Sequence, residues 1–184
     1  MKPLPLQDWD ASLDPVIDDM RGLPLNVHSL LANHPPLLEA WWRLRMYLVK
    51  GGDLGQRHCE LVILRIAVHM RSWYEWASHV LRGMESGLSL EEIDGLLHND
   101  HQWNVEDAVL IEAVDEIAQQ HAISPATLER LSSHYSDQQI LDIVHLHGMY
   151  TTLACLIKTW GIELDEHVEK RLPGSVRPDT FVTS

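Results

Sequence analysis

Hydrophobic residues recur along this chain at helical spacing, and no stretch alternates cleanly between apolar and polar residues between hairpin turns. The pattern predicts a helix that starts near Pro36 and ends at Gly51-Gly52, where left-handed backbone is easily adopted. The apolar face of this helix is predicted to hold Leu37, Trp41, Leu44 and Leu48.

The next predicted helix, from about Gln56 to Met70, is apolar on almost every side, which is typical of a helix at the centre of a fold. Glu60 and Arg65 lie within it. They are therefore candidate buried charges, and buried charges need partners.

A further helix is predicted from about Ser72 to Ser86, stopped by Gly87. Its apolar stripe contains Trp76, whereas Ser72, Glu75 and His79 share an arc of about 60° beside that stripe. The short turn at Arg71-Ser72 is expected to fold this helix back against the preceding one.

Capping signals predict the remaining helices, and the last long one runs from Ser136 to about Trp160 and stops at Gly161. Short connections between successive helices favour an all-α antiparallel bundle. We expect an N-terminal arm over residues 1–27, a helical domain over 28–170 and a C-terminal tail over 171–184. The predicted helix starts are Ser89, Asn104, Ser124-Pro125 and Ser136.

The 184 residues carry a formal net charge of −13, which argues against binding to nucleic acids or anionic membranes, since both need clustered Lys and Arg. An acidic small molecule stays possible as substrate, because a pocket can be locally positive in an acidic protein. The chain shows no signal-peptide pattern, and Cys59 and Cys155 form no C-x-x-C motif. We therefore expect free thiols and a cytoplasmic location.

The pair Glu75 and His79 allows two interpretations. It is either an ion pair on a solvated face, which stabilises little, or part of a reaction centre. The second is favoured by the tryptophan-rich surroundings and by Glu60 on the adjoining helix, since two carboxylates and an imidazole then converge.

The 12 histidines raise the question of a metal site. On a helix, His145 and His147 point about 200° apart and cannot share one ion within a chain. The His98-Asn99-Asp100-His101 stretch is more typical of a solvated loop. We therefore expect neither a metal nor another cofactor.

Several ordered segments resemble the carboxymuconolactone decarboxylase family, which also contains AhpD-type disulfide reductases. The resemblance covers roughly residues 30–165 and implies an all-α, AhpD-like oligomer, commonly a trimer or a hexamer. The segments that carry it are Asn33-His34-Pro35-Pro36, Arg57-x-x-Glu60-Leu61-Val62-Ile63-Leu64-Arg65, Tyr74-Glu75-Trp76-x-x-His79, Gly87-Leu88-Ser89-x-Glu91-Glu92-Ile93, His134-Tyr135-Ser136-Asp137 and Gly148-x-Tyr150.

In the peroxidase branch of the family, a C-x-x-C-x-x-x-H motif follows a glutamate on the previous helix. Matched by position, that glutamate is Glu60 and the histidine is His79, while Ser72 and Glu75 stand where the cysteines would be. Neither can take part in disulfide cycling, so alkylhydroperoxidase activity of that type is disfavoured.

The resemblance instead implies cofactor-free acid–base chemistry, a decarboxylation or proton transfer, on a small carboxylated lactone or keto acid. His79 is expected to move the proton, Glu75 to orient it, and Glu60 to act as a second carboxylate, paired with Arg65 without ligand. A non-catalytic oligomeric module that binds a ligand is the alternative. The expected substrate-binding residues are Tyr74, Ser72, Trp76 and Arg65.

Overall fold

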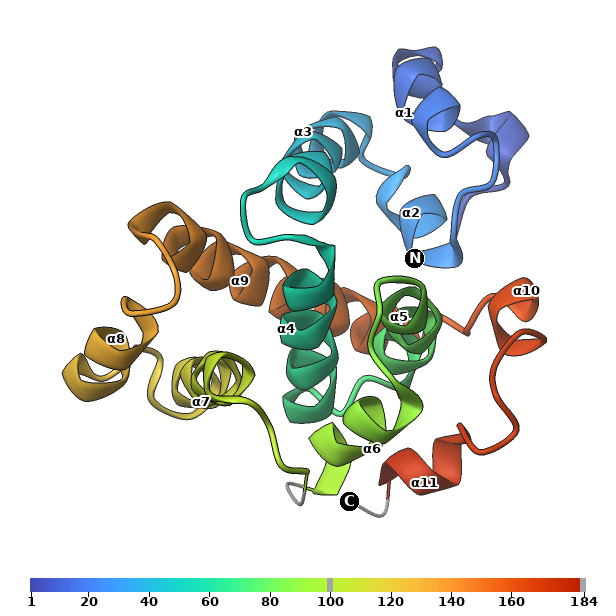
Figure 1. Cartoon of the computed structure of the whole chain (residues 1–184). Coiled ribbons are helices and arrows are strands. Elements are labelled where there is room, and N and C mark those ends of the chain that lie inside the picture. The colour runs from blue at the N-terminus through green and yellow to red at the C-terminus, as the bar shows by residue number, and fades with distance from the viewer. Residues whose placement is uncertain (99–100, 183–184) are drawn as a thin grey trace.

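The computed structural model describes residues 1–98 and 101–182, and all regular structure in those ranges is helical (Figure 1). The predicted all-α class is therefore confirmed. The elements are η1 (Leu6–Asp8), η2 (Ala11–Leu13), α1 (Asp14–Asp19), α2 (Asn26–Leu31), α3 (Pro35–Met46), the π-helical turn η3 (Tyr47–Gly51), α4 (Gln56–His69), α5 (Trp73–Glu85), α6 (Leu90–His98), α7 (Val105–Gln120), α8 (Pro125–Leu131), α9 (Asp137–Trp160), α10 (Glu166–Glu169) and α11 (Pro178–Val182).

Helix α4 occupies the centre, packed against α5, α6, α7 and α9 (Figure 1). Its residues from Cys59 to Ala67 are all buried, as the continuous apolar pattern predicts. Because Glu60 and Arg65 lie in this stretch, both charges are held inside the protein at 4% and 5% exposure.

The turn between α4 and α5 positions the two helices that carry the candidate site residues. Arg71 adopts the left-handed conformation (φ 47°), and the Ser72 N–H donates to the Ala67 carbonyl over 2.9 Å. The Arg71 N–H donates to the Val68 carbonyl, which completes the two-bond pattern of a Schellman motif. Helix α5 consequently returns along α4, as the short connection predicts.

The predicted caps are present. Ser89 and Glu92 exchange hydrogen bonds as a capping box, and Ser136 does the same with Gln139. Asn104 and Ser124 cap α7 and α8 through their side chains. These side chains satisfy backbone N–H groups that the first helical turn leaves without partners.

The predicted face of α3 is wrong for two of its four residues. Leu37 and Leu44 are 48% and 40% exposed, whereas Leu38, Trp42 and Arg45 are buried. The adjacent apolar pairs Leu37-Leu38 and Trp41-Trp42 place apolar residues on two neighbouring stripes, and spacing favours the stripe that ends in Leu44 over the one that ends in Arg45. The structure buries the stripe that contains a charge.

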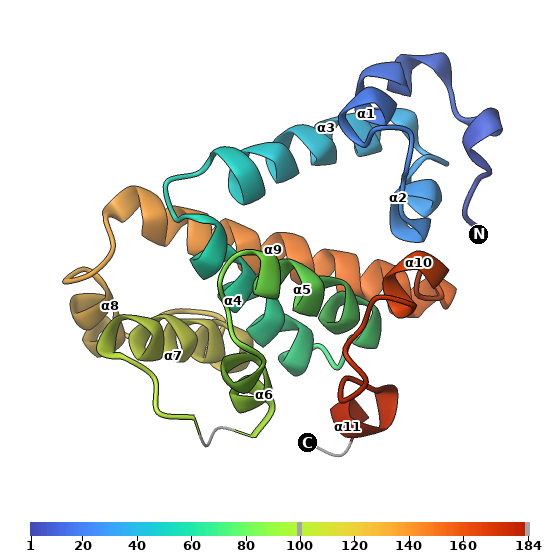
Figure 2. The same ribbon diagram turned by 45° about the vertical axis from the view of Figure 1, so that its right-hand side comes forward.

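The chain ends are packed against the bundle. In the N-terminal arm, Leu13 is fully buried, and α2 spans the expected boundary at residues 27 and 28. Figure 2 shows α1, α2 and α3 above α5 and α9. In the C-terminal tail, the ring of Phe181 lies 5.5 Å from that of Trp76.

Among the described residues, only Asp137–Trp160 is long and apolar enough to cross a membrane. Half of its most apolar window is buried inside the bundle, as in the core helix of a helical domain.

The Arg65 guanidinium joins α4 to α7 and α6. It donates to both carboxylate oxygens of Asp115, over 2.5 and 2.8 Å, and to the Leu96 carbonyl over 2.6 Å. The expected pair between Arg65 and Glu60 is therefore wrong. Because all three contacts tie helices together, Arg65 has a structural environment rather than that of an open binding residue.

We expect Asp115→Ala to lower the free energy of unfolding by about 3 kcal/mol, because it leaves the buried Arg65 charge uncompensated. Urea denaturation measures the change. Arg130→Ala, which removes the exposed pair with Glu112, serves as control and leaves the transition where it was. Equal transitions for wild type and Asp115→Ala would contradict the structural role.

Candidate active site

His79 lies between a carboxylate and a guanidinium. Its Nδ1–H donates to Glu60 Oε2 over 2.6 Å, and its Nε2 accepts from Arg82 Nη1 over 3.1 Å. Glu60 comes from α4 and the other two residues from α5, so the hairpin brings the contacts together. The ring of Tyr150, from α9, meets the imidazole edge-on at 5.0 Å.

The surface-pair interpretation of Glu75 and His79 is wrong. Glu75 is 2% exposed and His79 is 3% exposed. Glu60, not Glu75, bonds and orients the imidazole. The two acids and the imidazole are thus buried near one another, with the roles of the two acids exchanged relative to expectation.

Burial sets the protonation of both α5 groups. It lowers the pKa of His79; the nearby Glu60 opposes that shift, while Arg82 adds to it. Burial raises the pKa of Glu75 to about 8, an effect that Arg82 opposes and Glu60 reinforces. At neutral pH the site therefore holds a neutral imidazole with Nε2 as acceptor, and a carboxylic acid that carries a proton.

A cavity of about 20 Å³ lies beside these groups, and we call it the inner cavity. It is the size of a single water molecule. Glu75 Oε2 and Ser78 Oγ are buried without a hydrogen-bond partner among the described residues, and both residues line this cavity. Other lining residues that bear on the chemistry are His28, Arg45, His79, Arg82 and Tyr150.

A larger hollow of about 240 Å³, the outer groove, shares Arg45 and Arg82 with the inner cavity but is not lined by His79 or Glu75. Arg45 and Arg82 line both hollows, so the two guanidinium groups stand between them. Glu60 also lines the outer groove, together with Lys50, Gln56 and Glu85. This groove has the volume for a small organic molecule that the inner cavity lacks.

The hydroxyl groups of the two predicted binding residues Tyr74 and Ser72 differ in whether they already have hydrogen-bond partners. Tyr74 lines the inner cavity, but its hydroxyl donates to Asp165 over 2.5 Å and accepts from the Val27 N–H. The Ser72 hydroxyl is buried at the start of α5 and makes no hydrogen bond to the described residues. Tyr74 thus ties α5 to the chain ends, and only Ser72 keeps an unused hydroxyl.

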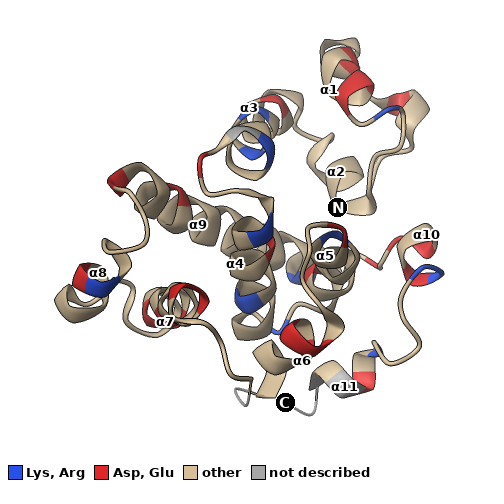
Figure 3. Ribbon diagram, in the orientation of Figure 1, with Lys and Arg blue, Asp and Glu red and all other residues tan. Residues whose placement is uncertain are grey.

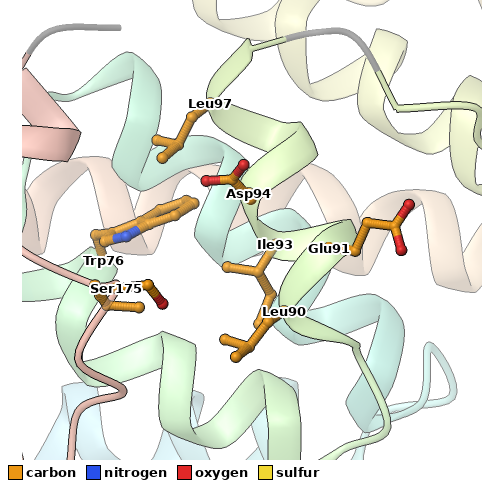
Figure 4. Close-up of a pocket in the computed structure, with 8 residues that line it drawn as sticks. Trp76, Leu90, Glu91, Ile93, Asp94, Leu97 and Ser175 are labelled. Carbon is orange, nitrogen blue, oxygen red and sulfur yellow. The ribbon is translucent and has the colours of Figure 1, made fainter.

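Trp76 lines a separate hollow of about 290 Å³ between α5, α6 and the C-terminal segment (Figure 4). In that view its indole lies near Asp94 and Leu97, while the Glu91 carboxylate points away. The expected convergence of Trp76 with the groups around His79 is therefore not observed.

Three residues that the sequence reasoning did not assign to the site complete it: Arg45, Arg82 and Tyr150. The sequence could have identified Arg82, because it lies three residues after His79 on the same polar side of the helix. Arg45 and Tyr150 come from other helices, and nothing in their local sequence points to His79.

Within residues 1–98 and 101–182, no group of three His, Cys, Asp or Glu side chains is arranged to hold a metal ion. Asn99 and Asp100 of the His98–His101 stretch lie outside the described residues. Cys59 is buried and Cys155 exposed, and both thiols are free.

The described residues form a helical bundle that buries an imidazole between a carboxylate and a guanidinium, with no thiol pair beside it. Residues 35–110 match the model of the carboxymuconolactone decarboxylase family. The matched segment contains α3, α4, α5 and α6 and supports the resemblance found in the sequence. No curated protein sequence matches the chain.

Solved structures share the fold over nearly the whole chain. An AhpD-core, peroxidase-related protein from Ralstonia eutropha JMP134 is 18% identical with a TM-score of 0.80, covering 93% of this chain and 96% of its own. A peroxidase-related protein from Silicibacter sp. TM1040 is 16% identical with a TM-score of 0.77, covering 96% and 92%. A cysteine-to-alanine variant of the debrominase Bmp8, in complex with 2,3,4-tribromopyrrole, is 13% identical with a TM-score of 0.76, covering 92% and 93%.

The raised pKa of Glu75 predicts how stability depends on pH. Between the ordinary value of 4.5 and about 8, the unfolded chain loses this proton while the folded chain keeps it, so stability falls as pH rises. The slope is about 1.4 kcal/mol per pH unit. Glu75→Gln abolishes it. Urea denaturation from pH 5 to 8 compares the two proteins, and parallel stability curves would contradict a neutral Glu75.

Proposed function

We propose that this protein is a cofactor-free acid–base catalyst that decarboxylates, or transfers a proton within, a small carboxylated lactone or keto acid. The match of residues 35–110 to the carboxymuconolactone decarboxylase family model supports an enzyme of this general kind. The substrate class rests on the chemistry of the site.

One observation carries the proposal: an imidazole acceptor and a protonated carboxyl group lie buried on one turn of α5, beside the inner cavity. Glu60 and Arg82, which both contact the imidazole, line the groove of about 240 Å³. His79 Nε2 has the lone pair of a base, held in place by Glu60 on the other nitrogen. Glu75 has the proton of an acid. Base and acid side by side at neutral pH are what proton transfer to and from carbon requires.

In a decarboxylation, the bond between carbon and the carboxylate breaks and CO₂ leaves. The electron pair of that bond passes into the conjugated carbonyl of the substrate. Glu75 then donates its proton to the carbon, which forms the new C–H bond, and a proton from solvent restores the acid. In a proton transfer, His79 Nε2 takes a proton from one carbon and Glu75 supplies one to another, so the site needs no external oxidant or reductant.

Thiol-dependent peroxidase chemistry is not proposed. Ser72 and Glu75 occupy the two positions that the resemblance assigns to cysteines, and the Cys59 thiol lies buried on α4, where it bonds the Leu48 carbonyl. If the protein binds small acids but turns none of them over, the alternative of a non-catalytic ligand-binding module holds instead.

His79→Gln and Glu75→Gln are each expected to reduce turnover about 10²- to 10⁴-fold, since each removes a proton-transfer group. The assay is a panel of unsaturated lactone carboxylates and β-keto acids, read by CO₂ release and by incorporation of solvent deuterium. His145→Gln changes an exposed histidine on α9 and leaves turnover at the wild-type level. Undiminished turnover in both site variants would refute these roles.

We also propose that the protein forms a cytoplasmic homo-oligomer, a trimer or a hexamer, as the family resemblance implies. Leu37, Leu44 and Tyr47 are 48%, 40% and 50% exposed on one side of α3 and η3, which supports an apolar contact surface there.

Light scattering is expected to give the mass of three or six chains, and Leu44→Glu to lower it without unfolding the protein. Leu23→Glu, at a residue that is 76% exposed and lies away from α3, is the matched control and keeps the wild-type mass. A monomeric wild type would end the oligomer proposal.

A further inference from the structure

Arg45 is a buried cation without an anion. It is 8% exposed, and among the described residues its guanidinium makes no ion pair and no hydrogen bond. Its one partner is the ring of Trp42, whose centroid lies 4.8 Å from the Arg45 Cζ. Burial lowers the pKa of Arg45, so enclosing this charge costs folding free energy. Proteins keep such a group where it binds something.

The two other cations of the outer groove also have no acid paired with them. Arg82 donates to the neutral His79 ring, and Lys50 is exposed at the end of η3. The acids are occupied: Glu60 is bonded by His79, and Glu85 pairs with Arg171 over 2.9 Å. The groove thus holds three cations, Arg45, Lys50 and Arg82, against the two carboxylates Glu60 and Glu85. It keeps an excess of positive charge in a chain of net charge −13.

Basic positions lie on all three helices around the groove, α3, α4 and α5 (Figure 3). Others lie on α8 and α10, and acidic positions are spread over these helices and over α1, α6 and α7. A locally positive hollow in an acidic protein concentrates small anions.

We propose that Arg45 and Arg82 bind the carboxylate of a small organic acid in the outer groove, and that this carboxylate draws Arg82 away from His79 Nε2. The planar guanidinium fork matches the two oxygens of a carboxylate. Gln56 adds a neutral hydrogen-bonding group and Val49 an apolar wall for the rest of the molecule. This deepens the proposed function, on which the second half of the inference rests.

The second half follows from what His79 contacts. In the absence of an anion, Arg82 occupies the Nε2 lone pair that a base needs. The groups facing the ring are Glu60 from α4, Tyr150 from α9, Arg45 from α3, and Arg82 and Glu75 from α5. The two arginines hold the pKa of His79 down and Glu60 holds it up, so neutralising the arginines raises it. Binding of the substrate carboxylate thereby prepares the base.

The test titrates the full-length protein with benzoate, benzamide and inorganic phosphate at constant ionic strength, followed by calorimetry and tryptophan fluorescence. We expect benzoate to bind saturably and the isosteric, uncharged benzamide not to bind. Arg45→Met is expected to weaken benzoate binding about ten- to a hundredfold, since it removes charged hydrogen bonds. Arg43→Met, on the same helix with a side chain 74% exposed, is the control and binds as wild type.

Loss of binding in Arg45→Met is separable from unfolding. Removing an unpaired buried charge leaves the ligand-free protein at least as stable as wild type, which thermal denaturation checks. Arg45→Lys is a second variant. It keeps the positive charge but lacks the planar guanidinium with its paired donors, so we expect it to bind benzoate weakly. Nuclear magnetic resonance of His79 adds a structural readout. Benzoate raises the pKa of His79 in wild type; in Arg82→Gln the ligand-free pKa is higher than in wild type, and benzoate raises it by less.

Equal binding of benzoate and benzamide, or full benzoate binding by Arg45→Met, would overturn the inference. Phosphate binding that exceeds benzoate binding and depends on Arg45 would overturn the assignment to carboxylates. Arg45-dependent benzoate binding without turnover of any acid in the panel keeps this inference and refutes the proposed function. Turnover that is unaffected by Arg45→Met would refute this inference and leave the proposed function standing.

Discussion

The hydrogen bond between Glu60 and His79 is the interaction on which the rest of the site depends. Glu60 lies in the buried stretch of the central helix α4, where a carboxylate without a donor is strongly unfavourable. The left-handed turn at Arg71 brings His79 within 2.6 Å of it. Satisfying a buried acid therefore fixes the imidazole, its tautomer and the direction in which Nε2 points.

Two buried glutamates with unlike surroundings follow from this arrangement. Glu60 receives an imidazole N–H, whereas Glu75 Oε2 has no donor among the described residues. Burial without a donor is what raises the pKa of Glu75 to about 8. The same dry environment that makes the acid costly to ionise makes it useful, because an acid with a pKa near that of the medium donates its proton readily.

The sequence predicts the bundle well because helix caps and apolar spacing are local. Ser136 and Asn104 need only their own first turns to act as caps. The site is predicted less well because its contacts are not local. Spacing on α5 favours Glu75 as the partner of His79, and only the packing of α4 shows that Glu60 takes that place. The burial of Arg45 could not be predicted from its local sequence either, since a charged residue is normally found on an exposed face.

The family resemblance also gives meaning to two otherwise unexplained hydroxyl and carboxyl groups. Ser72 and Glu75 stand where related proteins carry a cysteine pair, and both keep a buried oxygen without a partner. A pocket built around paired thiols must bury reactive atoms close to a base. An acid in place of sulfur keeps a buried group near the imidazole, and on the proposed function that group transfers protons instead of electrons. On the proposed function, the arginines beside the site would bind the anionic substrate that a thiol cannot capture here.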